Sequence, residues 1–532
     1  MRKFSSYGPV NTKLHYYAPR TELIDRAYTQ LLGEDPEEGG HYITVWAPRQ
    51  TGKSWLLLQV VQQFKHTDEF EVAILTMQSA KSETTAEGVL DILVRNLRDW
   101  FRRDFPQISA WKDLSTLFTK SYFSKPLILI LDEFDAISED GINAFANEFR
   151  NMYMKRQNEP DKPSGEKECV LHGLALIGIR TVLGIENVSG SPFNVQRSVH
   201  ISNLTFEEVD GMFKWYERES GQHVEQDVID RVYYETRGQP GLIGWFGELL
   251  TEGFEAYTPP KNRPISMEEF NQVFLWATKG LPNNNIINLI SKAKQAPYKP
   301  LVLDMFQTSK RIPFKYDHPE LSFLYMNGVI DIESAPGELY SKFASPFVQK
   351  RLFNYFAHEL FDYTGKLHEP FENLSDVFTE KGLNIRSVMN RFETYLKQNR
   401  EWLLQDAPRR KDLRIYEAVY HFCLYRYLCD FLGTGCARVY PEFPTGNGTI
   451  DLLITYSEAL YGLELKSYTD ETGYHKALTQ AARYGKQLQL AEISVIFFVE
   501  YVDDANRKTY EKEYVDDAAG VRVMPMFVAT GN

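Results

Sequence analysis

The chain is poor in cysteine, and it lacks both a long apolar run and an excess of positive charge. Its four cysteines do not have the spacing of a zinc site, and no histidine pair completes them. We therefore expect buried or half-buried thiols in a reducing compartment. Residues 126–131, the longest apolar run beside a motif, are far too few to span a bilayer.

The N-terminal segment and the net charge exclude two further classes of protein. Residues 1–9 include basic side chains but no apolar stretch, so they do not form a signal peptide. A formal net charge of −13 excludes a protein coated with basic surface, although nucleic acid binding needs only a local positive lining. We expect a soluble, cytoplasmic protein without a membrane partner.

What remains is an ordinary globular composition, with 43% hydrophobic and 14% aromatic residues. A chain of 532 residues is too long for one core, and at about 150 residues per domain it corresponds to about three or four domains. The sequence contains no internal repeat. We place the domains at residues 1–201, 202–260, 261–362 and 373–532.

The first domain alternates apolar strands with helical stretches, which predicts a parallel sheet covered by helices on both faces. The strands are expected at residues 42–46, 71–77, 127–131 and 173–179, with a helix at residues 55–64 after the first. Helices then follow from residue 202. Thr205 and Glu208 have the spacing of a capping box at the start of the first of them.

The third domain has the pattern of a small winged helix. Helices lead into an apolar segment at residues 324–332, a turn at Pro336 and Gly337, and a second strand at residues 339–343. A helix followed by a β-hairpin is typical of this fold. The fourth domain begins with helices and continues with strands.

The first strand runs directly into the loop Ala47–Ser54, which then enters a helix. Such a loop presents backbone N–H groups and the positive end of a helix to phosphate oxygens. Lys53 would reach the β- and γ-phosphates, and the Ser54 hydroxyl would ligate Mg²⁺. Ala47 replaces the first glycine of the usual pattern. The predicted nucleotide-binding residues are Pro48, Arg49, Gln50, Thr51, Gly52, Lys53 and Ser54.

A second apolar strand, at residues 127–131, ends in two adjacent acids, Asp132 and Glu133. Asp132 could hold the Mg²⁺ shell, and Glu133 could orient and deprotonate the attacking water. The alternative is that these acids only cap the next helix. Glu133, unlike a neutral residue, favours hydrolysis over simple nucleotide holding.

With these motifs, residues 1–250 resemble the AAA-like P-loop ATPases related to the archaeal-ATPase and STAND groups. The supporting segments are Tyr17–Leu23, Asp132–Asp135, Gly178–Arg180 and Gly238–Pro240. The resemblance implies that ATP is the nucleotide and that residues 17–20 lie near its base. It further implies that Arg180 senses the γ-phosphate or Mg²⁺, and that the Gly-x-Pro turn lies near the nucleotide in a helical lid.

Another set of charged residues lies near the C-terminus. If residues 449–456 and 460–467 form a hairpin, period-two alternation places Asp451, Glu464 and Lys466 on one face. Asp451 and Glu464, with the Leu465 carbonyl, could hold Mg²⁺, with Mn²⁺ as an alternative, while Lys466 positions or activates water. An exposed hairpin with solvated charges would give the same pattern.

Residues 373–532 resemble the PD-(D/E)xK nuclease superfamily, in the branch with a Gln-x-x-x-Tyr helix. The resemblance implies a restriction-endonuclease-like α/β fold in which Asp451, Glu464 and Lys466 are catalytic. It also implies that Glu417, on a helix at residues 416–431, supports the metal site. Gln480 and Tyr484 would bind the substrate strand. The sequence departs from the pattern at Asn447 and Thr449, where basic residues are often found, after a flexible Gly446.

Local basic clusters occur at residues 310–315 and 409–414, and each could contact phosphates or form a solvated face. Together the motifs predict an ATP-dependent or ATP-regulated, Mg²⁺-dependent endonuclease that acts on DNA, in genome defence or mobile-element control. The alternative is a nucleotide-dependent signalling or scaffold protein whose C-terminal module binds nucleic acid or protein without cutting. RNA as the substrate and self-association into a homo-oligomer are left open.

Overall fold

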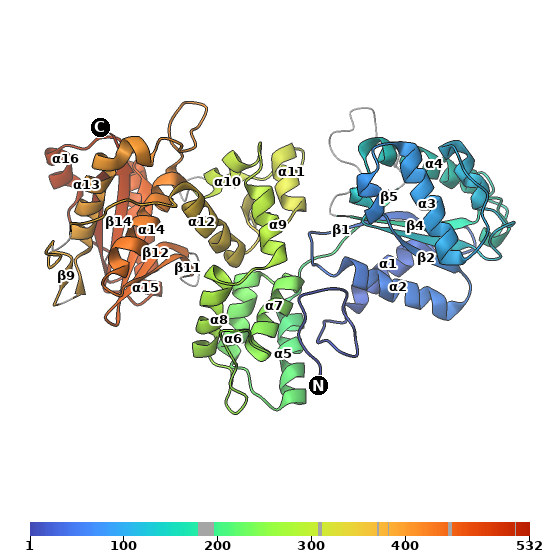
Figure 1. The fold of residues 1–532 in the computed structure, drawn as a ribbon, viewed down its shortest axis with the longest axis horizontal. Helices are drawn as coiled ribbons and strands as arrows, with labels where there is room; N and C mark the ends of the chain where they lie inside the picture. Colours follow the sequence, from blue (N-terminus) through green and yellow to red (C-terminus); the bar gives the residue numbers. More distant parts are fainter. Residues whose placement is uncertain are drawn as a thin grey trace. The chain divides into compact units, whose positions relative to one another are not determined.

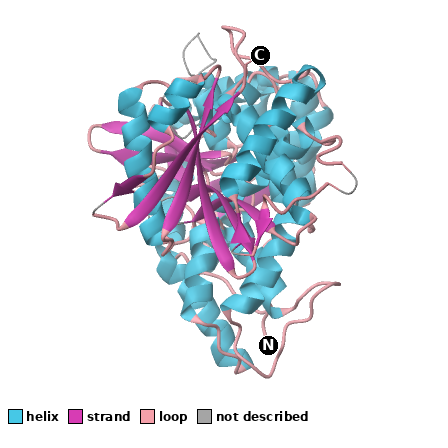
Figure 2. Cartoon of the chain, turned by 90° about the vertical axis from the view of Figure 1, so that its left-hand side faces the viewer, coloured by secondary structure: helices cyan, strands magenta, loops and turns pink. Residues whose placement is uncertain are grey.

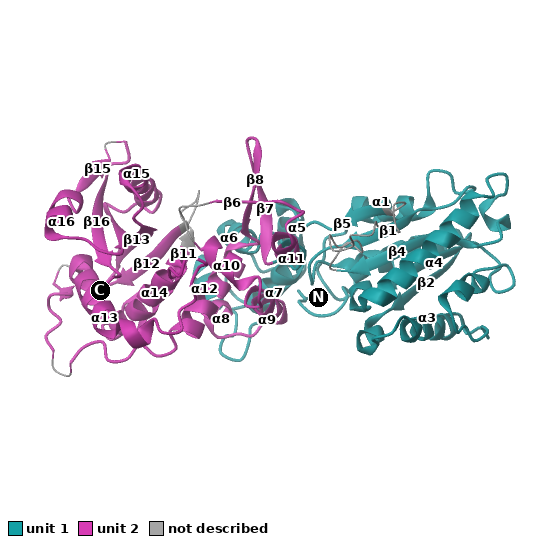
Figure 3. Cartoon of the chain, turned by 90° about the horizontal axis from the view of Figure 1, so that it is seen from above, with its two compact units in different colours: residues 1–275, 325–328 teal, residues 276–324, 329–532 magenta. Residues whose placement is uncertain are grey.

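The computed structural model describes residues 1–178, 196–306, 311–369, 372–380, 382–444, 449–516 and 518–531. The chain forms two compact units, coloured separately in Figure 3. The first comprises residues 1–275 and 325–328, and the second comprises residues 276–324 and 329–532. Within the described ranges, no helix is long and apolar enough to cross a membrane.

The first unit is built on a five-stranded parallel sheet with the order β2-β3-β4-β1-β5. The strands are β1 (Tyr42–Trp46), β2 (Glu71–Thr76), β3 (Leu127–Asp132), β4 (Leu171–Gly178) and β5 (Gln196–His200), and the flanking helices are α1 (Thr21–Leu32), α2 (Lys53–Thr67), α3 (Ala86–Phe101) and α4 (Glu139–Gln157). Short 3₁₀ turns lie at Gln78–Ser82, Trp111–Leu117, Phe134–Ala136 and Ser164–Glu166.

Helices cover both faces of this sheet, α1 and α2 on one side and α3 and α4 on the other (Figure 1). Leu127, Leu129 and Leu131 of β3 point into one core, while Ile128 and Ile130 point into the other. A strand buried on both faces needs apolar residues throughout, which explains why it reads as a continuous hydrophobic run. The predicted parallel sheet is confirmed.

Several boundaries differ from those predicted for the first unit. The strand expected at residues 173–179 is β4, which begins at Leu171 because the buried segment extends further towards the N-terminus. The helix expected at residues 55–64 is α2, which already begins at Lys53. The strand β5 was not predicted, because the polar sequence Gln-Arg-Ser-Val-His carries no apolar run and lies at the sheet edge.

Three helices follow the sheet: α5 (Phe206–Ser220), α6 (Gln226–Thr236) and α7 (Pro240–Thr251). The predicted capping box at the start of α5 is confirmed. The Glu208 N–H donates to Thr205 Oγ1 over 3.2 Å, and the Thr205 N–H donates to Glu208 Oε2 over 2.8 Å. Two of the otherwise unpaired donors at the helix start are satisfied in this way.

The next segment has a helix-and-hairpin pattern. Its helices are α8 (Met267–Lys279), α9 (Asn284–Ala293), α10 (Lys299–Met305), α11 (Pro319–Met326) and α12 (Pro346–Leu360), and its strands are β6 (Ile312–Pro313), β7 (Ile330–Ala335) and β8 (Glu338–Phe343). β7 and β8 pair antiparallel around the predicted turn, where Gly337 has a φ of 82°. The hairpin of the predicted winged helix is therefore present, with β6 as a third strand.

The rest of the second unit contains a six-stranded mixed sheet with the order β11-β12-β13-β14-β16-β15. Its strands are β11 (Arg438–Pro444), β12 (Thr449–Tyr456), β13 (Ala459–Ser467), β14 (Glu492–Val499), β15 (Tyr514–Asp516) and β16 (Val521–Ala529), with a separate pair β9 (Phe378–Thr379) and β10 (Gly382–Leu383). The helices are α13 (Ile385–Leu403), α14 (Glu417–Gly433), α15 (Glu471–Gln487) and α16 (Asp504–Tyr510). Figure 2 looks onto this sheet, whose strands fan out with a strong twist.

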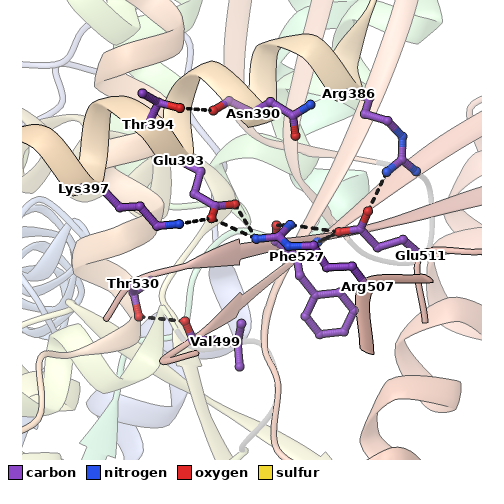
Figure 4. A network of polar contacts seen from close by, with 10 residues as sticks. All are labelled: Arg386, Asn390, Glu393, Thr394, Lys397, Val499, Arg507, Glu511, Phe527 and Thr530. Carbon is purple, nitrogen blue, oxygen red and sulfur yellow. Dashed lines mark hydrogen bonds and ion pairs between the residues drawn. The ribbon is translucent and has the colours of Figure 1, made fainter. Parts of the chain in front are cut away.

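An ion-pair network fastens two helices to this sheet (Figure 4). Arg507 on α16 donates to both carboxylate oxygens of Glu393 on α13, over 2.8 and 2.7 Å, and to the Phe527 carbonyl of β16 over 2.8 Å. Glu511 accepts from the Phe527 N–H over 2.9 Å and pairs with Arg386 over 2.6 Å. The arginine thus joins α16 and β16, which are near each other in the sequence, to α13, which is far from both.

An aromatic cluster explains why α12, at the end of the helix-and-hairpin segment, belongs to the same unit as the mixed sheet. Phe353 of α12 lies 4.8 Å from Phe422 and 5.3 Å from Tyr425 of α14, measured between ring centroids. Phe306 lies 5.4 Å from Phe422. These side chains are buried, so α12 and α14 share one hydrophobic core.

Candidate functional sites

The loop between β1 and α2 has the backbone that phosphate binding requires. Gly52 has a φ of 90° and Gln50 a φ of 57°, so the chain turns sharply before entering α2. The Thr51 hydroxyl closes the turn by donating to the Pro48 carbonyl over 2.9 Å. The free N–H groups of the first turn of α2 face the loop end, where the helix dipole favours an anion.

Lys53 is folded onto this loop. Its ammonium donates to the Ala47 carbonyl over 2.8 Å and to the Pro48 carbonyl over 2.7 Å. Burial lowers the pKa of Lys53 to about 8, although the carboxylates of Asp135 and Asp132 oppose this shift. A phosphate group placed against the loop would offer this lysine the negative partner that backbone carbonyls do not provide.

The two acids at the end of β3 adjoin the loop. Ser54 Oγ donates to Asp132 Oδ2 over 2.7 Å, so the predicted Mg²⁺ ligands from the two motifs are in contact. Glu133 is exposed and has a φ of 58°, and its Oε2 accepts from the Thr76 hydroxyl over 2.9 Å. A left-handed backbone at a non-glycine residue costs on the order of 1–3 kcal/mol and is often found at functional sites.

The helices after the sheet contact the loop through Gln239. Its Nε2 donates to the carbonyls of Arg49 and Gln50 over 3.1 and 3.3 Å, and its Oε1 accepts from the Leu242 N–H to cap α7. The Gly241 N–H also donates to the Gln50 carbonyl over 3.0 Å. A Cβ on Gly241 would lie 2.6 Å from the Gln50 side chain, so glycine is required for this close approach.

The second candidate site is carried by the hairpin of β12 and β13. Tyr456 pairs with Ala459 next to the turn, and the pairing continues along the strands to Leu452 with Leu463. The turn itself is formed by Ser457 and Glu458, whose φ angles are both positive. Asp451 and Glu464 are the next residues along this ladder, and Asp451 Oδ2 accepts from the Leu465 N–H over 2.6 Å. The predicted hairpin is therefore confirmed.

The other predicted residues of this site converge on Glu464. Its Oε1 accepts from Lys466 Nζ over 2.6 Å and from Gln480 Nε2 over 3.2 Å. Gln480 also donates to the Tyr484 hydroxyl over 3.0 Å, one turn further along α15. Glu417, at the start of α14, accepts from the Ser467 N–H over 2.7 Å. Glu464, Lys466, Gln480 and Tyr484 thus form one hydrogen-bonded chain, while Asp451 and Glu417 bond to the backbone N–H groups of Leu465 and Ser467.

Burial dominates the electrostatics of this region. Asp451, Glu464 and Lys466 are 3%, 0% and 5% exposed. Burial and the charge of Glu464 raise the pKa of Asp451 well above its usual range, while burial raises that of Glu417. Burial lowers the pKa of Lys466, but the carboxylates of Glu464 and Asp451 outweigh it and the net shift is upward.

The donor set at this site suits Mg²⁺. Within the described ranges, no group of three or more His, Cys, Asp or Glu side chains is arranged to hold a metal ion. Mg²⁺ commonly takes only one or two carboxylates and keeps several waters, so Asp451 and Glu464 with the Leu465 carbonyl would suffice. Glu464 Oε2 is buried without a hydrogen-bond partner, and a cation would satisfy it.

Two further residues at this site were not predicted. Pro441 pairs with Leu452 and Phe443 with Ile450, which places Glu442 beside Asp451. Glu442 is buried, has a φ of 48°, accepts from Gln349 Nε2 over 2.8 Å and contributes to the raised pKa of Asp451. His421, whose buried Nε2 has no hydrogen-bond partner, lies 3.8 Å from Glu417 Oε1. An acid between apolar residues of a strand was the available signal for Glu442.

A comparison with family models assigns the first of these sites. Residues 5–246 match the model described as an AAA-like domain. This range contains the phosphate-binding loop, the acids of β3 and Gln239. Residues 5–246 are an AAA-like P-loop ATPase domain. The sequence matches none of the curated proteins.

The chain is also similar to solved structures, all at low sequence identity. A Walker-type ATPase of Pyrococcus abyssi is 15% identical, with a TM-score of 0.44, covering 66% of this chain and 99% of its own. The Aeropyrum pernix ORC1 protein, solved with DNA, is 12% identical, with a TM-score of 0.33 and coverages of 63% and 92%. The Thermotoga maritima RuvB Holliday junction branch migration motor is 10% identical, with a TM-score of 0.32 and coverages of 60% and 91%.

The remaining predicted residues of the AAA-like domain have mixed outcomes. Tyr17 packs against Trp55, directly after the phosphate-binding loop, with ring centroids 5.6 Å apart. Arg20 donates to the Ser202 carbonyl over 2.8 Å and lies 3.4 Å from Glu208, so it holds the connection to α5. Arg180 lies outside the described residues.

The two basic clusters differ from a free phosphate-binding surface. Arg410 pairs with Asp304 over 3.2 Å and lies over the Tyr416 ring, and Arg409 donates to the Leu413 carbonyl. Lys310, Asn447 and Gly446 lie outside the described residues. Of the cysteines, Cys169 and Cys423 are buried and Cys429 is half-buried, but Cys436 is exposed, because it follows the end of α14.

Proposed function

We propose that this protein is an ATP-dependent or ATP-regulated, Mg²⁺-dependent endonuclease that acts on DNA, with a role in genome defence or mobile-element control. The observation that carries the proposal is the convergence of Asp451, Glu464, Lys466 and Gln480 on one buried patch. Two buried carboxylates and a buried ammonium, which pairs with Glu464, are poorly explained as a structural core, because each ion loses hydration there. They are well explained as a site for attack on a phosphodiester.

At the ATPase site, the loop N–H groups would receive the phosphates of ATP, and Lys53 would exchange its carbonyl partners for phosphate oxygens. Ser54 and Asp132 would hold Mg²⁺, which neutralises the charge that develops during phosphoryl transfer. Glu133 is exposed and held by Thr76, so it would orient a water molecule and accept its proton.

At the nuclease site, Asp451 and Glu464 would hold Mg²⁺, a Lewis acid that polarises the scissile phosphate. Lys466 would turn its ammonium from Glu464 towards the attacking water or the phosphate oxygens. Gln480 would keep Glu464 oriented, and with Tyr484 it would contact the substrate strand. Glu417 would support the site through the backbone of Ser467.

One observation favours the second candidate, a nucleotide-dependent scaffold protein that does not cleave. The carboxylates of Asp451 and Glu464 are almost fully buried, so a substrate could reach them only after local opening. A scaffold would retain this charged core for its architecture alone. The two candidates differ in whether metal ions and Asp451 are needed for activity.

The test is incubation of the purified full chain with closed circular plasmid DNA, single-stranded DNA and RNA. Mg²⁺ or Mn²⁺ is supplied, with and without ATP, and Asp451→Asn serves as the matched variant. We expect metal-dependent nicking of the closed circle by the wild type and none by the variant. If the wild type cuts no substrate under any of these conditions while it still hydrolyses ATP, the result favours the scaffold function or an endonuclease that lacks its activator.

A further inference from the structure

The second unit contains a cavity of about 510 Å³ that belongs to neither of the sites above. Side chains of α8, α9, α12 and α14 line it. This volume lies within the range of pockets that bind small organic ligands, roughly 300–1,000 Å³. The cavity is therefore large enough for one ligand the size of a nucleoside monophosphate.

The cavity is lined by more cationic side chains than there are carboxylates to neutralise them. Arg426 pairs with Asp430 over 3.2 Å, and the one carboxylate in the lining, Glu359, pairs with Lys299 over 2.7 Å. Lys279 and Arg351 have no carboxylate within ion-pairing distance in the part of the chain that the structure describes. Arg351 uses its Nη1 on the backbone carbonyls of α8 and the residues after it.

An amide in the lining also lacks a partner. Asn354 Oδ1 accepts from the Tyr425 hydroxyl over 3.0 Å, whereas the buried Asn354 Nδ2 has no hydrogen-bond partner. Leaving such a donor unpaired costs about 1–3 kcal/mol. Because Asn354 lines the cavity, a small rotation of its side chain would let this donor bond to an oxyanion there.

From this arrangement we propose that the cavity binds a small organic phosphate. Lys279 and Arg351 supply two positive charges for a dianionic phosphate group, and Asn354 Nδ2 supplies a neutral donor. Tyr355 and Ile290, which also line the cavity, offer an apolar surface to the organic part of the ligand. A volume of about 510 Å³ fits one small molecule better than an extended nucleic acid strand. This proposal is independent of whether the protein cleaves DNA.

The test is isothermal titration of the full chain carrying Lys53→Ala, which removes the phosphate contact of the ATPase loop. The probes are pyrophosphate, AMP and a single-stranded oligonucleotide, at constant ionic strength set with chloride. We expect one site per chain. Lys279→Gln and Asn354→Asp, each added to Lys53→Ala, should weaken binding at least about tenfold, because each removes a donor to the phosphate.

Asn354→Asp keeps the oxygen that accepts from Tyr425, and Lys279 lies on a different helix, so the two variants test the site independently. Thermal unfolding confirms that each variant is folded. The control, Lys476→Gln, changes an exposed lysine of α15 and should leave binding unchanged. Three results would overturn the proposal: no binding of either pyrophosphate or AMP, equal binding in all variants, or binding of the single-stranded oligonucleotide alone.

Discussion

The two sites of this protein are both centred on a lysine, but the two lysines have opposite electrostatic surroundings. Lys53 donates to backbone carbonyls, and burial lowers its pKa to about 8. Lys466 donates to Glu464, and although burial lowers its pKa, the neighbouring carboxylates raise it overall. The first lysine lacks an anionic partner, whereas the second already has one.

The acids differ in the same way. Asp132 is half-buried and Glu133 is exposed, whereas Asp451 and Glu464 are 3% and 0% exposed. A soluble nucleotide can reach the first pair directly. In the second pair, Glu464 is held by Lys466 and Gln480, and Asp451 by the Leu465 N–H, so these buried charges need either such partners or a cation. The comparison therefore contrasts an ATPase site that is accessible to its ligand with a buried second site, which would have to open before a substrate could reach it.

The sharpest way to break the comparison is Glu133→Gln, which should leave nucleotide binding intact and reduce ATP hydrolysis about 10²–10⁴-fold. The reason is that glutamine retains the bond from Thr76 but cannot accept a proton from water. Turnover and ATP affinity are measured on the same preparation. Glu139→Gln, an exposed helix position, should change neither. Hydrolysis that survives Glu133→Gln would remove this residue from the catalytic role.

The stability of the two units can be compared through ion pairs. Arg507→Ala leaves Glu393 and Glu511 without their shared partner. We expect the free energy of unfolding of the second unit, measured by urea titration, to decrease by about 1–3 kcal/mol. This range is reduced because the arginine side chain is 23% exposed. Asp68→Ala in the AAA-like domain removes an exposed pair with Lys125 and should cost less than about 1 kcal/mol. Equal losses of unfolding free energy in the two variants would contradict this difference between the two ion pairs.

The two lysines also predict different pH dependence. Because the pKa of Lys53 is lowered to about 8, its charged form is lost as pH rises above that value, before an ordinary lysine would lose its proton. ATP affinity should then fall by up to about tenfold per pH unit above pH 8. Lys466, with its raised pKa, should keep its charge, so metal-dependent cleavage should not decline in this window. ATP affinity that stays constant between pH 8 and pH 9 would contradict the lowered pKa.

The smallest expected effect concerns the contact between α7 and the phosphate-binding loop. Gln239→Ala removes the cap of α7 and the bonds to Arg49 and Gln50, which should cost about 0.5–2 kcal/mol of stability. ATP affinity should weaken a few-fold, because the loop loses its support. Gln226→Ala, at the start of α6, is the control for a polar contact away from the loop. No change in either quantity would show that α7 does not hold the loop.

The sequence was sufficient for features that depend on local pattern. Continuous apolar runs predicted the buried parallel strands, and period-two alternation predicted the hairpin that carries Asp451 and Glu464. The loop at Lys53 was recognisable because its residues are contiguous. In each case a short segment contains both the structural signal and the functional side chains.

Features that depend on distant segments were not predictable. Glu442 comes beside Asp451 only through the pairing of β11 with β12, and Arg20 finds its partners at Ser202 and Glu208. The polar strand β5 is defined by its pairing with β1 and not by its own composition. Long-range pairing determines these contacts, and a single sequence carries little signal for it.

The most direct test of two separate sites in one chain is to measure ATP hydrolysis and DNA cleavage together in the wild type, Lys53→Ala and Lys466→Ala. Lys53→Ala should abolish ATP hydrolysis. Lys466→Ala should leave ATP hydrolysis unchanged and reduce metal-dependent cleavage about 10²–10³-fold, because the charge at the reacting phosphate is lost. Cleavage that persists in Lys466→Ala at the wild-type rate would contradict the assignment of the nuclease site.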